Sequence, residues 1–511
     1  MTETLSIFLK KNFILLTIIL FALFLYTFKL GSIPFALHGD ESETALQAIE
    51  ISKINTGIIG VGWYDIPLLS FLPHTISMAV FGQTITGNRI ASVFFGIGTL
   101  LLFYLLIQLL IGRRPAAIAT FLLSTSHMWI ALSRFGTIYT QAAFFVVGSL
   151  YFTFRGIHKR NALDFAIGGI FFSLCFYSYY AARIAPFILF PCFILCFILD
   201  KFPRKFFIQL TFFAVAAIIT FLPQGVFFVN HPDSFLSRIK YVSITNNLSE
   251  QDYVNKTIPE ILVLQTQKTF NGIFIGDNSG QYGYKGQLFD YATIIFAIIG
   301  FVWILISFDF LSFIIILWLI LAVATSQILT IGPPPIFLPR FIVGIPALFV
   351  ICSLGIEFML KKTKKYSKII NSVIVIIILI ITFNNLFIYF FKYPNQQKEG
   401  IAGDPNAYNA TEIARFINKS NNPQTVIFLT APYIYADFGP IRFLSPKKSR
   451  VGIDNVANYI IDGRYGKNTL YVIYPQYAYK IPELLSVYPK GTITQFTNGD
   501  ENVRFTIFSS N

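Results

Sequence analysis

Residues 13–51, FILLTIILFALFLYTFKLGSIPFALHGDESETALQAIEI, carry the two features on which the prediction of the fold rests. The stretch begins with an apolar run over 13–30, which is long enough to cross a bilayer. Three carboxylates, Asp40, Glu41 and Glu43, follow closely behind this run. An apolar run that leads directly into clustered acids indicates a membrane protein with polar chemistry at one face of the membrane.

The composition of the whole chain agrees with a membrane protein. Of its 511 residues, 55% are hydrophobic, 17% aromatic and 13% charged, whereas roughly 25% of residues are charged in soluble domains. This composition excludes a soluble globular enzyme and a disordered chain. No disulfide or cysteine metal site is expected, because all four cysteines fall within apolar runs, where a free thiol behaves as a small hydrophobe.

The apolar runs predict eleven transmembrane helices. Their ranges are 13–30, 89–111, 116–132, 138–154, 165–180, 184–199, 206–229, 289–306, 309–329, 337–359 and 369–391. Lys and Arg gather in alternate loops between these runs, as they do on the cytoplasmic side of membrane proteins. We therefore expect a multi-pass protein of the plasma membrane with a cytoplasmic N-terminus. The net charge of +14 then belongs to loops, and no nucleic-acid partner is expected.

Three long segments fall on the opposite, extracytoplasmic side: 31–88, 230–288 and 393–511. The first contains an amphipathic stretch, Glu43 to Ile54, that predicts helices lying at the interface. The last predicts a small α/β domain, with a helix over 408–418 and strands over 425–432 and 469–475. The expected architecture is an α-helical membrane domain over 1–392, with an extracytoplasmic α/β domain over 393–511.

Asp40 and Glu41 are the first candidates for chemistry. A carboxylate at a membrane boundary can remove a proton from a hydroxyl, and a pair of carboxylates can bind a divalent cation. The alternative is that Asp40 or Ser42 caps the helix that follows, since acids and serine are favoured at a helix N-terminus.

Four arginines at the extracytoplasmic ends of predicted spans form the second group: Arg89, Arg134, Arg183 and Arg340. Arginine is disfavoured on this side, and bidentate recognition of a phosphate is a function that suits it. The alternative is that they snorkel to lipid headgroups or pair with Asp40, Glu41 or Asp65.

Aromatic residues near the same face form the third group: Trp63, Tyr64, Tyr179 and Tyr180. They are candidates for substrate binding, although Tyr and Trp are enriched at membrane interfaces regardless of function.

Several stretches, taken in order, resemble those of GT-C membrane glycosyltransferases that use polyprenyl-phosphate sugars, specifically the superfamily of protein mannosyltransferases and aminoarabinose transferases (glycosyltransferase families 39 and 83). They are GDESETALQA (39–48), PLLSFLP with FG (67–82), NRIAS (88–92), SRFGT (133–137), YSYYAARIAP (177–186), HPDSFLSRIKYVSI (231–244) and LPRFIVGIPAL (338–348). The chain departs from the aminoarabinose branch at 65–68, which read DIPL, and Tyr139 stands near the place of a second acid.

The resemblance implies that Asp40 is the base and Glu41 its partner, and that Arg134, Arg183 and Arg340 bind the donor phosphate. It also implies a polyprenyl-phosphate sugar as co-substrate. A divalent cation held by Asp40 and Glu41 is an option that the carboxylates themselves suggest. The expected reaction is an inverting transfer to a protein, lipid or glycan acceptor on the outer face of the membrane. The sequence specifies neither the sugar, the acceptor nor the oligomeric state.

Two other classes of protein compete with this interpretation. A lipid or polyprenyl-phosphate transporter would pass a phosphate along the arginines, but it would place charges deep within the spans instead of at one face. A non-catalytic scaffold would leave the acids and the outer arginines without a purpose.

Overall fold

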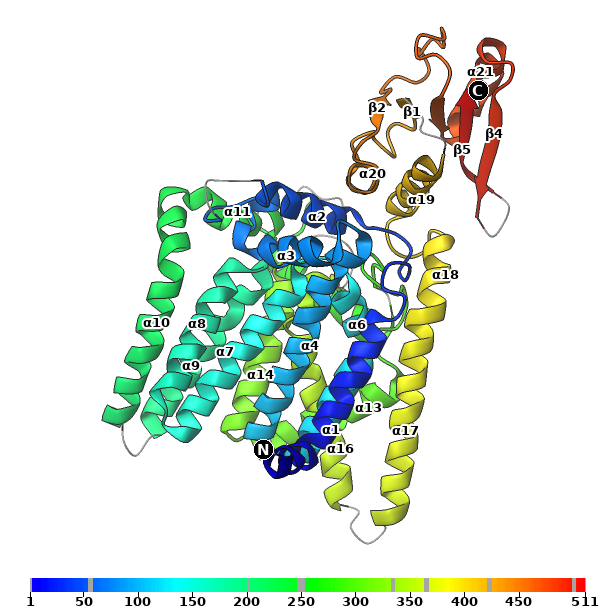
Figure 1. The fold of residues 1–511 in the computed structure, drawn as a ribbon. Helices are drawn as coiled ribbons and strands as arrows, with labels where there is room; N and C mark the ends of the chain where they lie inside the picture. The colour runs from blue at the N-terminus through cyan, green and yellow to red at the C-terminus, as the bar shows by residue number, and fades with distance from the viewer. Residues whose placement is uncertain are drawn as a thin grey trace.

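The computed structural model describes residues 2–53, 58–199, 203–245, 253–276, 278–331, 336–362, 367–420, 425–498 and 502–510. A bundle of long helices carries a layer of short helices at one end, and a small sheet lies beyond that layer (Figure 1). The prediction of a helical membrane protein with a C-terminal sheet is confirmed.

Every one of the eleven predicted segments contains a helix. The helices of the bundle are α1 (Thr2–Thr27), α4 (Ile85–Leu110), α5 (Arg113–Thr125), α6 (His127–Arg134), α7 (Tyr139–Lys159), α8 (Ala162–Leu174), α9 (Ala185–Leu199), α10 (Pro203–Asn230), α13 (Tyr291–Ser307), α14 (Phe310–Val323), α16 (Ile345–Lys362) and α17 (Ser367–Phe387). The segment predicted over 116–132 is broken, because α5 and α6 meet at an angle of 63°.

By length and composition, five helices within the described residues can cross a membrane, or six if α5 and α6 count as one span. Shorter apolar helices accompany them, at Asn12–Thr27, Leu68–Phe81, Ala162–Tyr177 and Tyr291–Ser307. The count of eleven spans and their orientation therefore stay predictions.

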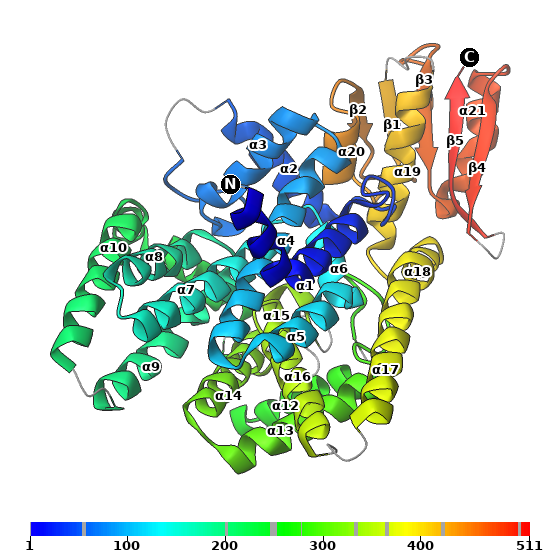
Figure 2. The same ribbon diagram turned by 60° about the horizontal axis from the view of Figure 1, so that its bottom comes forward.

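Glycines allow the closest helix contacts in the bundle. A Cβ on Gly300 of α13 would lie 1.9 Å from the carbonyl oxygen of Ile351 on α16, and one on Gly355 would lie 2.1 Å from that of Phe296. Small residues of this kind let helix backbones approach within a membrane. Figure 2 shows α13 with α16 on one flank, and α8, α9 and α10 together on the other.

Short helices cross the end of the bundle that faces the sheet, namely α2 (Gly39–Ile51), α3 (Leu72–Phe81) and α11 (Pro232–Val242) (Figure 1). The amphipathic stretch predicted from Glu43 thus belongs to α2, although its last residue, Ile54, lies outside the described residues. The cap prediction is wrong. His38 caps α2, since its Nδ1 accepts the backbone N–H of Asp40 at 3.1 Å, and the acids occupy the first turn.

The C-terminal region forms a five-stranded sheet in the order β2-β1-β3-β5-β4. The strands are β1 (Thr425–Leu429), β2 (Ser449–Gly452), β3 (Thr469–Ile473), β4 (Thr492–Thr497) and β5 (Val503–Ser510). β1 pairs parallel with β2 and β3, whereas β5 is antiparallel to β3 and β4. The predicted helix and both predicted strands are present, as α19 (Pro405–Lys419), β1 and β3.

The side chains of β1 alternate between two apolar clusters, one on each face of the sheet. Val426 and Phe428 pack with Ile413 of α19 on one face, while Ile427 and Leu429 pack on the other face against a separate apolar cluster. Successive side chains of a strand point to opposite faces, so a fully buried strand needs both faces covered.

Candidate functional site

A cavity of about 340 Å³ lies where the short helices meet the end of the bundle. We call it the tyrosine cavity after its lining residues, which are Asp40, Trp63, Tyr64, Ile66, Tyr139, Tyr179, Tyr180, Arg238, Tyr241, Val242, Gln281, Tyr282, Ile331, Phe337 and Arg340. These residues come from distant parts of the chain. Polar groups that converge on one cavity are the usual mark of a binding site.

Asp40 is the carboxylate that lines the tyrosine cavity. It sits in the first turn of α2 and is half-buried. Its Oδ2 accepts a hydrogen bond of 2.5 Å from the hydroxyl of Tyr139 and another from the hydroxyl of Tyr282. Burial and the adjacent Asp40 carboxylate hold the pKa of Tyr282 well above its ordinary value, so this phenol stays a donor. The two hydroxyls thus fix the orientation of the carboxylate.

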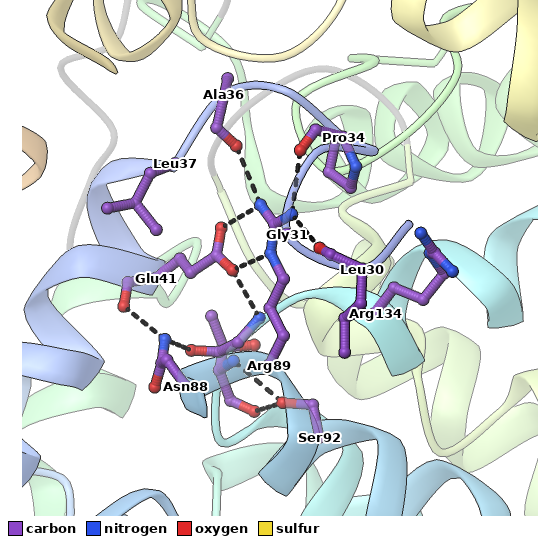
Figure 3. Close-up of polar contacts among 12 residues, drawn as sticks. Leu30, Gly31, Pro34, Ala36, Leu37, Glu41, Asn88, Arg89, Ser92 and Arg134 are labelled. Atoms are coloured by element: carbon purple, nitrogen blue, oxygen red, sulfur yellow. Dashed lines mark hydrogen bonds and ion pairs between the residues drawn. The ribbon is translucent and has the colours of Figure 1, made fainter. Parts of the chain in front are cut away.

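Glu41, the neighbour of Asp40, has a different environment. Its side chain is 0% exposed and pairs with the equally buried Arg89, with Nε 2.6 Å from Oε1 and Nη2 3.0 Å from Oε2. Arg89 also donates to the carbonyl oxygens of Leu30, Pro34 and Ala36, as Figure 3 shows. A buried pair of this kind holds the segment that leads into α2, and neither partner lines the tyrosine cavity.

Arg134 is also fully buried. Its guanidinium donates to the carbonyl oxygens of Leu25, Phe28 and Ile33 at 2.6–2.7 Å and to the hydroxyl of Tyr389 at 3.1 Å. Nε and both terminal nitrogens are thereby engaged with protein groups. This placement argues against the predicted contact of Arg134 with a donor phosphate.

The option of a divalent cation shared by Asp40 and Glu41 does not fit the residues present. Both oxygens of Glu41 accept from Arg89, and Asp40 accepts from two phenols. In the described part of the chain, no three His, Cys, Asp or Glu side chains form a group that could hold a metal ion.

A second, larger cavity of about 550 Å³ adjoins the first and has mostly apolar walls. We call it the apolar cavity, and its lining includes Ile184, Phe187, Ile239, Leu262 and Leu329. The two cavities share the lining residues Tyr179, Tyr180, Arg238, Val242 and Arg340. Two arginines therefore stand where a polar cavity meets an apolar one.

Arg183 of the short helix η4 (Tyr180–Ile184) lines the apolar cavity only. One terminal nitrogen donates to the carbonyl oxygen of Phe235 at 2.7 Å, and the guanidinium lies 4.3 Å from the ring centroid of Tyr180. Its Nε and its other terminal nitrogen are buried and have no hydrogen-bond partner among the described residues.

The structure brings together most of the predicted site. Asp40, Arg340 and the aromatic residues Trp63, Tyr64, Tyr179 and Tyr180 all line the tyrosine cavity, whereas Glu41, Arg89 and Arg134 do not. Sequence reasoning did not nominate Arg238, Tyr241 or Tyr282. Arg238 and Tyr241 lie in the stretch 231–244 that carried part of the family resemblance, and this is the one signal that could have found them.

Known proteins resemble the chain in its first half and in its overall fold. Residues 65–227 match the family model described as dolichyl-phosphate-mannose-protein mannosyltransferase. ArnT from Cupriavidus metallidurans aligns with 97% of this chain and 98% of its own length, at a TM-score of 0.58 and 12% identity in the apo state. The chain has a GT-C fold. The resemblance inferred from the sequence motifs is thereby confirmed.

Two further GT-C structures extend the comparison. ArnT bound to undecaprenyl phosphate matches with a TM-score of 0.54 and 13% identity over 97% and 98% of the two chains. The oligosaccharyltransferase AglB from Archaeoglobus fulgidus, in complex with an inhibitory peptide and a dolichol-phosphate, matches with a TM-score of 0.53 and 14% identity over 97% and 74%.

A relative in Bacillus subtilis, named "Putative mannosyltransferase YkcB", is 27% identical over 99 residues. The match spans 19% of this chain and 14% of the relative.

Proposed function

We propose that the chain is an inverting glycosyltransferase that moves one sugar from a polyprenyl-phosphate donor to a protein, lipid or glycan acceptor. The observation that carries the proposal is the junction of the two cavities at Arg238 and Arg340. A polyprenyl-phosphate sugar has the same sequence of parts, namely a polar sugar, an anionic phosphate and a long apolar chain. The apolar cavity suits the isoprenoid, the arginines suit the phosphate and the tyrosine cavity suits the sugar.

Arg238 and Arg340 would neutralise the negative charge that grows on the phosphate as the bond to the sugar breaks. Arginine forms bidentate bonds to phosphate, and preorganised cations at a developing charge are a large part of catalysis. Arg183 lines the apolar cavity and would support the same anion from its lipid side.

Asp40 would act on the acceptor. In the transfer, the acceptor oxygen forms a bond to the anomeric carbon, the acceptor proton passes to the Asp40 carboxylate, and the bond from carbon to phosphate oxygen breaks. The polyprenyl phosphate leaves with the electron pair of that bond. Inversion requires base and leaving group on opposite faces of the sugar. Where the acceptor is already an anion, Asp40 would orient it without removing a proton.

Glu41 and Arg134 take positioning roles in this proposal. Arg89 and Arg134 together bind six carbonyl oxygens between Leu25 and Ala36, so they fix the path of the chain from α1 into α2. The proposal also keeps the predicted topology, with the cavities and the domain over 393–511 on the outer face and the N-terminus in the cytoplasm.

The test is sugar transfer from radiolabelled polyprenyl-phosphate hexoses and pentoses by purified protein in lipid, measured as water-soluble or acceptor-bound label. We expect donor-dependent turnover that Asp40→Asn reduces by about a thousandfold while donor binding persists. Asp65→Asn is the matched control, since Asp65 belongs to the same extracytoplasmic segment but does not line the tyrosine cavity. Folded protein that binds these lipids, moves them between leaflets and transfers no sugar would support a transporter instead.

A further inference from the structure

The segment that leads into Asp40 is held from two sides. On the bundle side, Arg89 and Arg134 bind its carbonyl oxygens. On the opposite side, the C-terminal domain contacts the same segment and the first turn of α2. Figure 2 shows α20 (Gly439–Leu444) beside α2, and α19 on the far side of α20.

Thr411 of α19 makes the first of these contacts. The backbone N–H of Leu37, a fully buried residue, donates to Thr411 Oγ1 at 2.9 Å. The hydroxyl proton of Thr411 is directed elsewhere, because it donates to the carbonyl oxygen of Ala407 at 2.7 Å. The oxygen therefore presents a lone pair to Leu37, three residues before Asp40, and a buried N–H that loses its acceptor is costly.

Gly439, at the start of α20, makes the second contact. A Cβ at this position would lie 2.3 Å from Ser42 Oγ and 2.8 Å from Glu43 Oε1. The Ser42 hydroxyl is itself engaged, since it donates to the carbonyl oxygen of Gly39 at 2.7 Å. Only a residue without a side chain lets α20 approach the first turn of α2 this closely.

Other contacts surround these two. Arg442 Nη1 of α20 lies 3.6 Å from Glu43 Oε1, and Phe35 packs against Tyr408 with the rings tilted and their centroids 4.7 Å apart. The guanidinium of Arg415 lies 4.3 Å from the centroid of Phe35. The contact surface thus covers both sides of Asp40 in sequence, from Phe35 to Glu43.

From this arrangement we propose that Thr411 and Gly439 are positioning residues for Asp40, and that the C-terminal domain thereby forms part of the catalytic device. The inference rests on the proposed glycosyl transfer. A shift of the first turn of α2 would move the Asp40 carboxylate relative to the hydroxyls of Tyr139 and Tyr282. Misplacement by about 1 Å can cost two orders of magnitude in rate. Donor binding would be unaffected, because Arg238 and Arg340 belong to other elements.

The experiment compares Thr411→Val, which keeps the shape and removes the acceptor, with Thr411→Ser, which keeps the acceptor. Gly439→Val is compared with Gly452→Val, because a Cβ on Gly452 of the same domain makes only an ordinary contact, 3.5 Å from Ala436. For each purified protein we would measure kcat, KM for the donor, the melting temperature and amide hydrogen exchange over residues 36–46.

We expect Thr411→Val and Gly439→Val to lower kcat by about tenfold or more with an unchanged KM for the donor. Amide hydrogen exchange over residues 36–46 should be faster in these two variants. Thr411→Ser and Gly452→Val should have the kcat and the hydrogen exchange of the wild type. Unchanged kcat per folded molecule and unchanged exchange would overturn the proposal, as would a loss of activity that follows the melting temperature alone. If the wild type transfers no sugar, the proposed function fails, and hydrogen exchange still decides whether the domain holds α2.

Discussion

Replacing Glu41 by Gln should destabilise the protein strongly, although the change removes only a charge. Glu41 and Arg89 are both 0% exposed, so the substitution leaves a guanidinium that is buried without its counter-ion. Loss of one partner from a buried pair costs about 3–5 kcal/mol. An unfolding entropy of about 2.1 cal/mol/K per residue makes 1 kcal/mol worth about 1 °C in a chain of 511 residues, so we expect a fall in melting temperature of about 3–5 °C.

The assay is thermal unfolding of the purified protein in detergent, followed by intrinsic fluorescence. Glu50→Gln serves as the control, because it makes the same chemical change at an exposed position of the same helix. Surface substitutions usually change stability by less than about 0.5 kcal/mol. Asp40→Asn should melt close to the wild type, since an amide oxygen can still accept from the two phenols that hold it.

Substitutions of the two neighbouring acids are thus expected to have different effects: Asp40 is needed for turnover, and Glu41 is needed for the stability of the fold. If Glu41→Gln has the same melting temperature as Glu50→Gln and yet loses sugar transfer, Glu41 takes part in the chemistry. Our assignment of Glu41 to a structural pair would then be wrong.

Three further outcomes follow from the geometry. Arg340→Gln should raise KM for the donor by about tenfold or more through loss of a charged phosphate contact, and an unchanged KM in donor titrations would remove Arg340 from the donor site. Tyr139→Phe and Tyr282→Phe should each lower kcat several-fold, and the double variant should show an effect that is not the sum of the two, because both hydroxyls bind one oxygen of Asp40. Gly300→Val should lower the melting temperature by forcing α13 away from α16 without changing KM for the donor, and equal melting would show that the two helices can separate at no cost.

The helical segments could be predicted from the sequence, because runs of about twenty apolar residues have few alternatives to a membrane helix. The elements α19, β1 and β3 could be predicted for a similar reason, because their apolar residues recur at the spacing of a helix or a strand. The strands β2, β4 and β5 were missed. β4 reads TITQFT and is largely exposed, so it lacks the apolar alternation that identifies a half-buried strand.

The different roles of the arginines could not be predicted from the sequence. Arg134 and Arg340 have similar settings in the sequence, each near the end of an apolar run, and nothing local separates a residue that binds backbone carbonyls from one that lines a cavity. The difference arises from α1 and the loop after it, which place six carbonyl oxygens around Arg89 and Arg134. Contacts between residues about 50–110 positions apart leave no periodic signal in the chain.

The adjoining cavities also have a consequence for how the spent lipid and the finished product leave. The apolar cavity reaches the surface of the molecule, because its lining residues Ile239, Phe187 and Leu329 are 46–61% exposed. If the chain transfers sugar as proposed, a polyprenyl phosphate would enter and leave through this opening in exchange with the surrounding lipid. The acceptor would then approach by the tyrosine cavity, which Asp40 lines. For a transferase built this way, release of one product need not wait for the other, and replenishment of the donor depends on diffusion within the plane of the membrane.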